Sequence, residues 1–172
     1  LAVVCSRAGA LLQRAELARQ RERFGDARAD ASAALDVLIA LRVRHPGHPI
    51  VRARLAQALQ IRGQAELQDG DAEAALATLG RALDELTGHA AADPEDAAPL
   101  QRLVTLLYDL GNAARQRGRD LAAADPARAQ ALGDQARSRY LDAQTLLGKL
   151  RAAGRLPAGF DALDAPLAER LA

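Results

Sequence analysis

The 172-residue sequence is 49% hydrophobic but only 2% aromatic, and Ala and Leu dominate it. Both are strong helix formers, whereas strands prefer β-branched and aromatic residues, so we expect an all-α fold. The 23 basic and 22 acidic residues leave a net charge of +1. This balance argues against nucleic acid or a membrane as the main partner, because both usually demand a clear basic excess.

Residues 1–5 are apolar but lack the basic leader of a signal peptide, and no apolar run approaches the roughly 18 residues of a membrane span. A cytoplasmic location is therefore expected. Cys5 is the only cysteine, which excludes an internal disulfide. The sequence contains no Met, not even at position 1, so we expect a fragment of a longer protein or a processed chain.

The apolar pattern predicts seven helices in chain order. They span residues 2–24, 26–44, 50–69, 71–91, 95–117, 126–153 and 161–171. In the fourth of them, apolar residues recur every three or four positions and define one face for a core: Leu76, Leu79, Leu83 and Leu86. The intervening loops are short, so neighbouring helices should pack as antiparallel hairpins.

Aspartates and glycines predict where the helices begin and end. Three aspartates are expected at helix N-termini, where a carboxylate accepts hydrogen bonds from backbone N–H groups: Asp26, Asp71 and Asp93. Three glycines are expected where a helix stops and the chain reverses: Gly25, Gly70 and Gly118. After the last of these an insertion delays the next helix to about Pro126, which predicts a longer loop or a short helix there.

The sequence also repeats internally. A shift of 48 residues superimposes Pro46 on Pro94, Leu55 on Leu103, Leu59 on Leu107, Gly63 on Gly111, Ala65 on Ala113 and Gly70 on Gly118. An offset of 45 aligns Gly25, Asp26 and Ala27 with Gly70, Asp71 and Ala72. Such a set of matches indicates a helical repeat with a unit in the mid-forties.

These units resemble tetratricopeptide repeats of the lengthened kind found in bacterial multidomain signalling proteins, including arrays beside kinase domains. The matching residues are a small residue seven positions before the turn glycine, the Gly-Asp turn, a small residue in the second helix and a closing proline: Ala18, Gly63, Gly111, Gly25-Asp26, Gly70-Asp71, Ala75, Pro46 and Pro94. The resemblance implies a single domain of antiparallel helical hairpins, stacked as a short right-handed α-solenoid. Its units would span residues 1–46, 47–94 and 95–153, with a closing helix at 160–172.

The resemblance further implies a non-catalytic module that binds a peptide or helix of a partner protein on its concave face. First-helix positions that line this face in the family correspond to Arg19, Gln57, Gln60, Gln64, Thr105, Tyr108, Asn112 and Arg115. The Lys and Asn pattern of chaperone-binding members is absent. Two alternatives stay open: the face is simply solvated, or the chain is an architectural or dimerising arm of a larger signalling or effector protein.

The sequence shows no pattern typical of catalysis, and we expect no enzyme activity, cofactor or metal. His45 and His48 have a two-residue spacing but flank Pro46 and Gly47 in a turn, and zinc sites need three or four ligands. None of the serines lies in a nucleophile motif, and the isolated glycines form no phosphate-binding loop.

Charge is segregated along the chain. Residues 1–54 carry a net charge of +5, residues 55–100 carry −7, and the remainder carries +3. Four arginines around one turn could form a basic patch: Arg42, Arg44, Arg52 and Arg54. We favour the alternative that arginines provide solubility and pair with acidic side chains. A basic end beside an acidic middle could also steer a charged partner or favour a homodimer.

Overall fold

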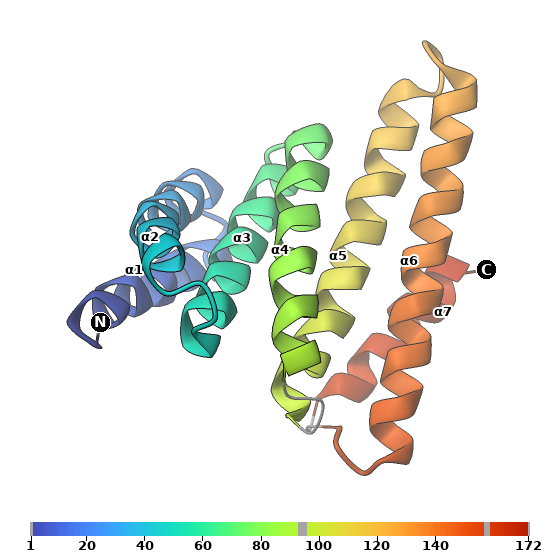
Figure 1. Ribbon diagram of the computed structural model, residues 1–172. Coiled ribbons are helices and arrows are strands. Elements are labelled where there is room, and N and C mark those ends of the chain that lie inside the picture. Colours follow the sequence, from blue (N-terminus) through green and yellow to red (C-terminus); the bar gives the residue numbers. More distant parts are fainter. Residues whose placement is uncertain (1, 93–95, 157–158, 172) are drawn as a thin grey trace. The chain divides into compact units, whose positions relative to one another are not determined.

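The computed structural model describes residues 2–92, 96–156 and 159–171, and within these ranges it is all-α (Figure 1). The helices are α1 (Ala2–Gln20), α2 (Phe24–Arg44), α3 (Pro49–Gln68), α4 (Ala72–Ala92), α5 (Ala97–Leu121), α6 (Pro126–Ala152), the 3₁₀ helix η1 (Phe160–Leu163) and α7 (Asp164–Leu171). The prediction of an all-α fold with seven α-helices is confirmed, and their bounds agree with the predicted ones to within a few residues. Among the described residues, no helix combines the length and apolarity needed to span a membrane.

The chain divides into two compact units, Leu1–His89 and Ala90–Ala172, which we call the N-terminal unit and the C-terminal unit. In the N-terminal unit, α1 and α2 pack as a first hairpin and both contact α3, which runs into α4 as the second hairpin (Figure 1). In the C-terminal unit, α5 and α6 form a third, longer hairpin, and α7 packs against α6. The cores lie between these antiparallel helices, as the apolar spacing predicted.

The helix boundaries follow a constant repeat of 48 residues through the first two hairpins. Helices α2 and α4 have the same length and begin 48 residues apart, and α3 and α5 also begin 48 residues apart. Buried positions follow the same shift: Ala27, Ala31, Ala34 and Leu38 in α2 correspond to Ala75, Leu79, Ala82 and Leu86 in α4. The predicted offset of 45 between the first two units is therefore wrong.

Backbone hydrogen bonds at the two turns explain this correction. The N–H of Arg23 donates to the carbonyl of Ala18 at 2.9 Å, and the N–H of Asp71 donates to the carbonyl of Glu66 at 2.9 Å. Arg23 therefore occupies the place of Asp71. Asp26 lies inside the first turn of α2 and pairs with Arg23, and Gly25 is a helical residue. The prediction that these two residues mark a helix boundary is wrong, because the Gly-Asp pair comes three residues too late.

The turn between α3 and α4 has the predicted chemistry. Gly70 has a φ of +87°, a conformation that favours glycine, and the Asp71 carboxylate accepts from the N–H of Ala74 at 3.0 Å. The predicted cap Asp93 and the closing Pro94 lie outside the described residues. Helix α5 begins after Asp96, whose side chain accepts from the N–H of Ala98 at 2.9 Å.

The insertion in the third hairpin lengthens its helices. Gly118 was predicted to end a helix, but α5 continues to Leu121. The chain turns just before Asp125, which caps α6. Buried residues of α6 follow those of α4 by 61 positions: Ala136, Tyr140, Ala143 and Leu147 correspond to Ala75, Leu79, Ala82 and Leu86. The inserted residues therefore lengthen both α5 and α6. At Gly118 a Cβ would lie 3.1 Å from the carbonyl oxygen of Ala129, so glycine permits close approach of the two helices.

Candidate functional site

Four residues of the predicted concave face lie in the N-terminal unit. Gln57, Gln60 and Gln64 are partly exposed and share one stripe of α3, at a spacing of three and four residues. Arg19 lies on α1, where its Nε donates to Glu16 Oε2 at 3.0 Å. This hydrogen bond lowers the pKa of Glu16 below its ordinary value, against the opposing effect of partial burial. The charge of Arg19 is thus compensated within its own helix.

The other four residues lie on α5, and three of them surround one buried side chain of α6. The Tyr108 ring is tilted against the Tyr140 ring, with centroids 5.8 Å apart. The Tyr140 hydroxyl donates to Asn112 Oδ1 at 3.0 Å, and Arg115 lies near enough to lower the pKa of the same hydroxyl. Thr105 instead donates to the carbonyl of Arg102 at 2.9 Å, within its own helix turn. This half of the predicted face therefore supports the hairpin core.

Tyr140 itself is 1% exposed and was not among the predicted site residues. Its burial raises the pKa of the phenol above its ordinary value of 10.0, and the charges of Arg170 and Arg115 oppose that shift. Its presence as one of two tyrosines was the available signal. The burial of Tyr140 could not be predicted, because the insertion in the third hairpin obscures the repeat correspondence between Tyr140 and Leu79.

Part of the segregated charge is neutralised by contacts between helices of the N-terminal unit. Arg42 of α2 and Arg52 of α3 both approach Glu85 Oε2 of α4, each at 3.3 Å. Arg28 of α2 lies 3.5 Å from Asp69 at the end of α3. Arginines of the basic segment therefore pair with acids of the acidic segment. This supports the pairing interpretation for two of the four arginines proposed as a basic patch.

A cavity of about 350 Å³ lies where the first hairpin meets the second. Arg28 and Ser32 of α2 face Arg62 and Glu66 of α3 across it. Glu66 is only 3% exposed, its Oε1 accepts from Arg62 at 2.7 Å, and its Oε2 has no hydrogen-bond partner within the described ranges. Arg62 and Glu66 are paired with each other, and Arg28 pairs with Asp69.

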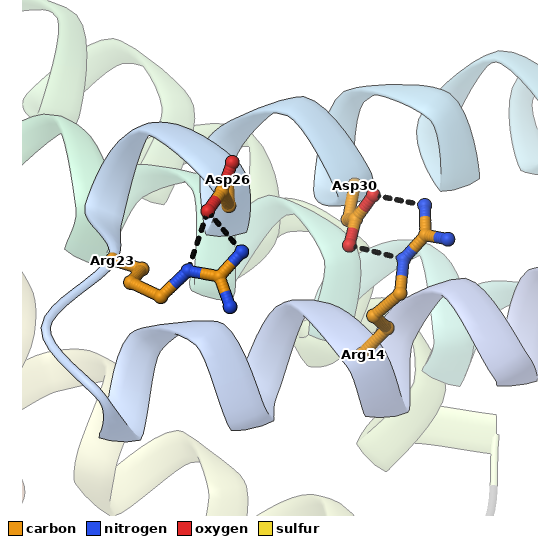
Figure 2. A network of polar contacts seen from close by, with 4 residues as sticks. All are labelled: Arg14, Arg23, Asp26 and Asp30. Carbon is orange, nitrogen blue, oxygen red and sulfur yellow. Dashed lines mark hydrogen bonds and ion pairs between the residues drawn. The ribbon is translucent and has the colours of Figure 1, made fainter.

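An open cleft of about 380 Å³ lies on the first hairpin between α1 and α2. Figure 2 shows the two ion pairs that border it: Arg14 of α1 binds Asp30 of α2 through two hydrogen bonds, and Arg23 of the turn binds Asp26. The hydrogen bonds that Arg14 donates to Asp30 raise the pKa of Arg14 above its ordinary value. The rest of the cleft is formed by Leu17 of α1, by Arg21 of the turn that follows α1, and by small alanine side chains. Leu17 is 53% exposed.

Metal-binding residues are not gathered in the part of the chain that the structure describes. No group of three or more His, Cys, Asp or Glu side chains there could hold a metal ion. The rings of His45 and His48 are 6.5 Å apart in an edge-on arrangement. The free thiol of Cys5 is buried in a small cluster with Leu41 and Val51.

Comparisons with protein-family models, with curated proteins and with solved structures found no match for this chain. The arguments about function that follow therefore depend on the geometry of the described residues and on their repeat correspondence.

Proposed function

We propose that the chain is a non-catalytic protein-interaction module, and that the α3 stripe of Gln57, Gln60 and Gln64 is its peptide-binding face. The observation that supports this most directly is the stripe itself. Three long amide side chains lie on one helical face and remain partly exposed on the central helix of the N-terminal unit. An amide both donates and accepts hydrogen bonds, so it suits the N–H and C=O groups of a bound peptide backbone.

The proposed face is smaller than the one predicted from the sequence. Asn112 and Tyr108 contact Tyr140, so a peptide that used them would have to compete with the core of the third hairpin. Arg19 is engaged by Glu16 and remains about one-third exposed, which leaves it a secondary contact. Uncharged amides should make binding weakly dependent on salt, unlike recognition by a charged cluster.

A selection experiment tests this proposal without a known partner. A random peptide library would be selected against the full chain, and each enriched peptide titrated into ¹⁵N-labelled protein. We expect amide shifts along α3 and loss of binding in Gln57→Ala/Gln60→Ala/Gln64→Ala, with helicity unchanged. The matched control is Gln135→Ala, an exposed amide on α6. Enriched peptides that bind the triple variant as tightly as the wild type would exclude the α3 face.

A second candidate function is a dimerising arm, and three exposed apolar side chains favour it. Ile39 and Val43 lie one turn apart on α2, Ile50 follows at the start of α3, and they are 41%, 78% and 52% exposed. Apolar groups that are exposed close together are typical of contact surfaces. Light scattering of the chain and of Val43→Glu distinguishes the two candidates: a dimer that dissociates in the variant supports the arm, and a monomer in both excludes it.

A further inference from the structure

The second hairpin shows what normally covers one surface of this repeat. Ala65 of α3 is fully buried in a cluster with Ala18 and Ala27 of the first hairpin, against which Phe24 packs. One turn beyond Ala65, Asp69 at the C-cap of α3 pairs with Arg28 of α2 at 3.5 Å. The start of helix α2 therefore lies on this surface, with small and apolar groups over Ala65 and a cation opposite the acid.

The first hairpin presents the same surface uncovered. By the 48-residue repeat, Leu17 corresponds to Ala65 and Arg21 to Asp69. Ala65 is fully buried, whereas Leu17 is 53% exposed and lines the open cleft between α1 and α2. Arg14 and Arg23 are paired with acids there, but no hydrogen bond or ion pair engages the Arg21 side chain within the described ranges.

We propose that this cleft is a docking site for one amphipathic helix of a partner protein, which lies on α1–α2 as α2 lies on α3. The repeat correspondence supports the geometry, because the equivalent surface one hairpin along is an established helix interface. The two exchanged residues specify the chemistry of the occupant. Arg21 in place of Asp69 requires a carboxylate where α2 carries Arg28. Leu17 in place of Ala65 requires small side chains among the groups that cover it, which in α2 are Ala27 and the neighbouring Phe24.

This docking site is separate from the α3 stripe of the proposed function, so either proposal can fail alone. Its occupant should place alanine-like residues over Leu17 and direct an Asp or Glu to Arg21. Of the three arginines and two aspartates that line the cleft, Arg21 is the one without an ion pair to a described residue, so it selects for the sign of the partner's charge. Leu17 provides the exposed apolar surface of the cleft, since Ala18 is 6% exposed and packs with Ala27 and Ala65.

Two peptides that differ at one position test the proposal. The probe peptide has the sequence of α2, residues 24–44, with Phe24→Ala and Arg28→Glu; the control peptide carries Phe24→Ala alone. Each is titrated into the ¹⁵N-labelled full chain. We expect the probe peptide to shift amides of residues 14–30 and to bind more tightly than the control peptide. In Arg21→Asp, which copies Asp69, the preference should invert, and the ratio of the two dissociation constants should change about tenfold.

A matched control separates local recognition from bulk charge. Arg137 is exposed on α6, and Arg137→Asp makes the same charge change away from the cleft, so it should leave the preference intact. Equal binding of the two peptides, or inversion by Arg137→Asp as well, would overturn the proposal. Light scattering of the chain alone adds a further outcome: a dimer that Arg21→Asp dissociates would assign the cleft to a second copy and overturn the partner helix.

Discussion

The second and third hairpins bring their helices together at the same repeat position but with different side chains. A Cβ added at Gly63 of α3 would lie 2.6 Å from Leu79 Cγ, and a Cβ added at Gly111 of α5 would lie 2.3 Å from Tyr140 Cε1. Leu79 and Tyr140 are 0% and 1% exposed. In each hairpin, a glycine in the first helix makes room for a large side chain of the second.

The first hairpin extends the comparison. By the 48-residue repeat, Ala15 and Ala31 occupy the places of Gly63 and Leu79, and both are fully buried. The second-helix residue thus grows from Ala to Leu to Tyr, while the first-helix residue shrinks from Ala to Gly. Interiors are packed close to crystal density, so a larger group on one helix requires a smaller one opposite. The tyrosine adds a further requirement, since its hydroxyl needs the Asn112 partner.

The largest expected effect comes from removing the two large side chains. Tyr140→Ala should destabilise the chain by about 3–5 kcal/mol, the range for buried aromatic residues, because the glycine opposite cannot fill the space. Leu79→Ala should cost about 2–5 kcal/mol. Urea unfolding followed by circular dichroism measures both. A loss below about 1 kcal/mol for Tyr140→Ala would contradict its place in the core.

Tyrosine fluorescence shows which of the two units each substitution destabilises. Both tyrosines lie in the C-terminal unit and the chain has no Trp, so this signal reports on α5 and α6 alone. If the units unfold independently, Leu79→Ala should lower the urea midpoint of the circular dichroism signal below that of the tyrosine fluorescence signal. Coincident transitions would instead show that the two units unfold cooperatively.

A smaller effect follows from filling the glycine sites. Gly111→Ala places a methyl group against a rigid ring, and overpacking of this kind costs about 1–3 kcal/mol, offset in part by the higher helix propensity of alanine. Gly63→Ala should cost less, because the branched end of Leu79 can rotate. Gly133→Ala and Gly80→Ala are matched controls with open space around the new methyl group, and should stabilise by about 0.5–1 kcal/mol. Stabilisation by Gly111→Ala would show that Tyr140 does not constrain this position.

The fold was largely predictable because helix propensity, apolar spacing and turn residues all favour the same elements. Asp71 and Gly70 were placed correctly, since a cap and a left-handed glycine depend on local chemistry alone. Asp26 and Gly25 were misplaced because an identical Gly-Asp pair suggested the wrong register. Only the buried positions and turn hydrogen bonds reveal the 48-residue repeat there, and those depend on tertiary packing.

The candidate site was less predictable than the fold. Family positions placed three glutamines on one stripe of α3 correctly, because spacing along a helix fixes its face. They also placed Asn112 and Tyr108 on a binding face, where the structure has them supporting Tyr140. The insertion between α5 and α6 changes which residues meet, and no local pattern encodes that change. The exposure of Leu17 was not predicted either, because it depends on what packs against the outer surface of the first hairpin.

The tyrosine hydroxyl can be tested separately from the ring. Tyr140→Phe keeps the packing against Gly111 but removes the hydrogen bond to Asn112, and such a bond contributes about 1 kcal/mol. Asn112→Ala should cost a similar amount or slightly more, because it leaves the buried hydroxyl without its acceptor. In the double variant the two losses should not add, and the coupling measured by urea unfolding should be about 0.5–1 kcal/mol. Simple additivity would mean that Asn112 does not stabilise Tyr140.

The smallest expected effect is confined to alkaline pH and also distinguishes the third hairpin from the second, which has no tyrosine. Burial raises the pKa of Tyr140 above 10.0 in the folded chain. Below that pH both folded and unfolded chains keep the phenol proton, so the group adds no pH dependence. As pH rises above it, the unfolded chain loses the proton first, and the free energy of unfolding must fall. Unfolding midpoints between about pH 8 and about pH 11 should therefore decrease less in Tyr140→Phe than in the wild type. Tyr108→Phe is the matched control; if it flattened the alkaline decrease and Tyr140→Phe did not, the buried phenol would have been assigned to the wrong residue.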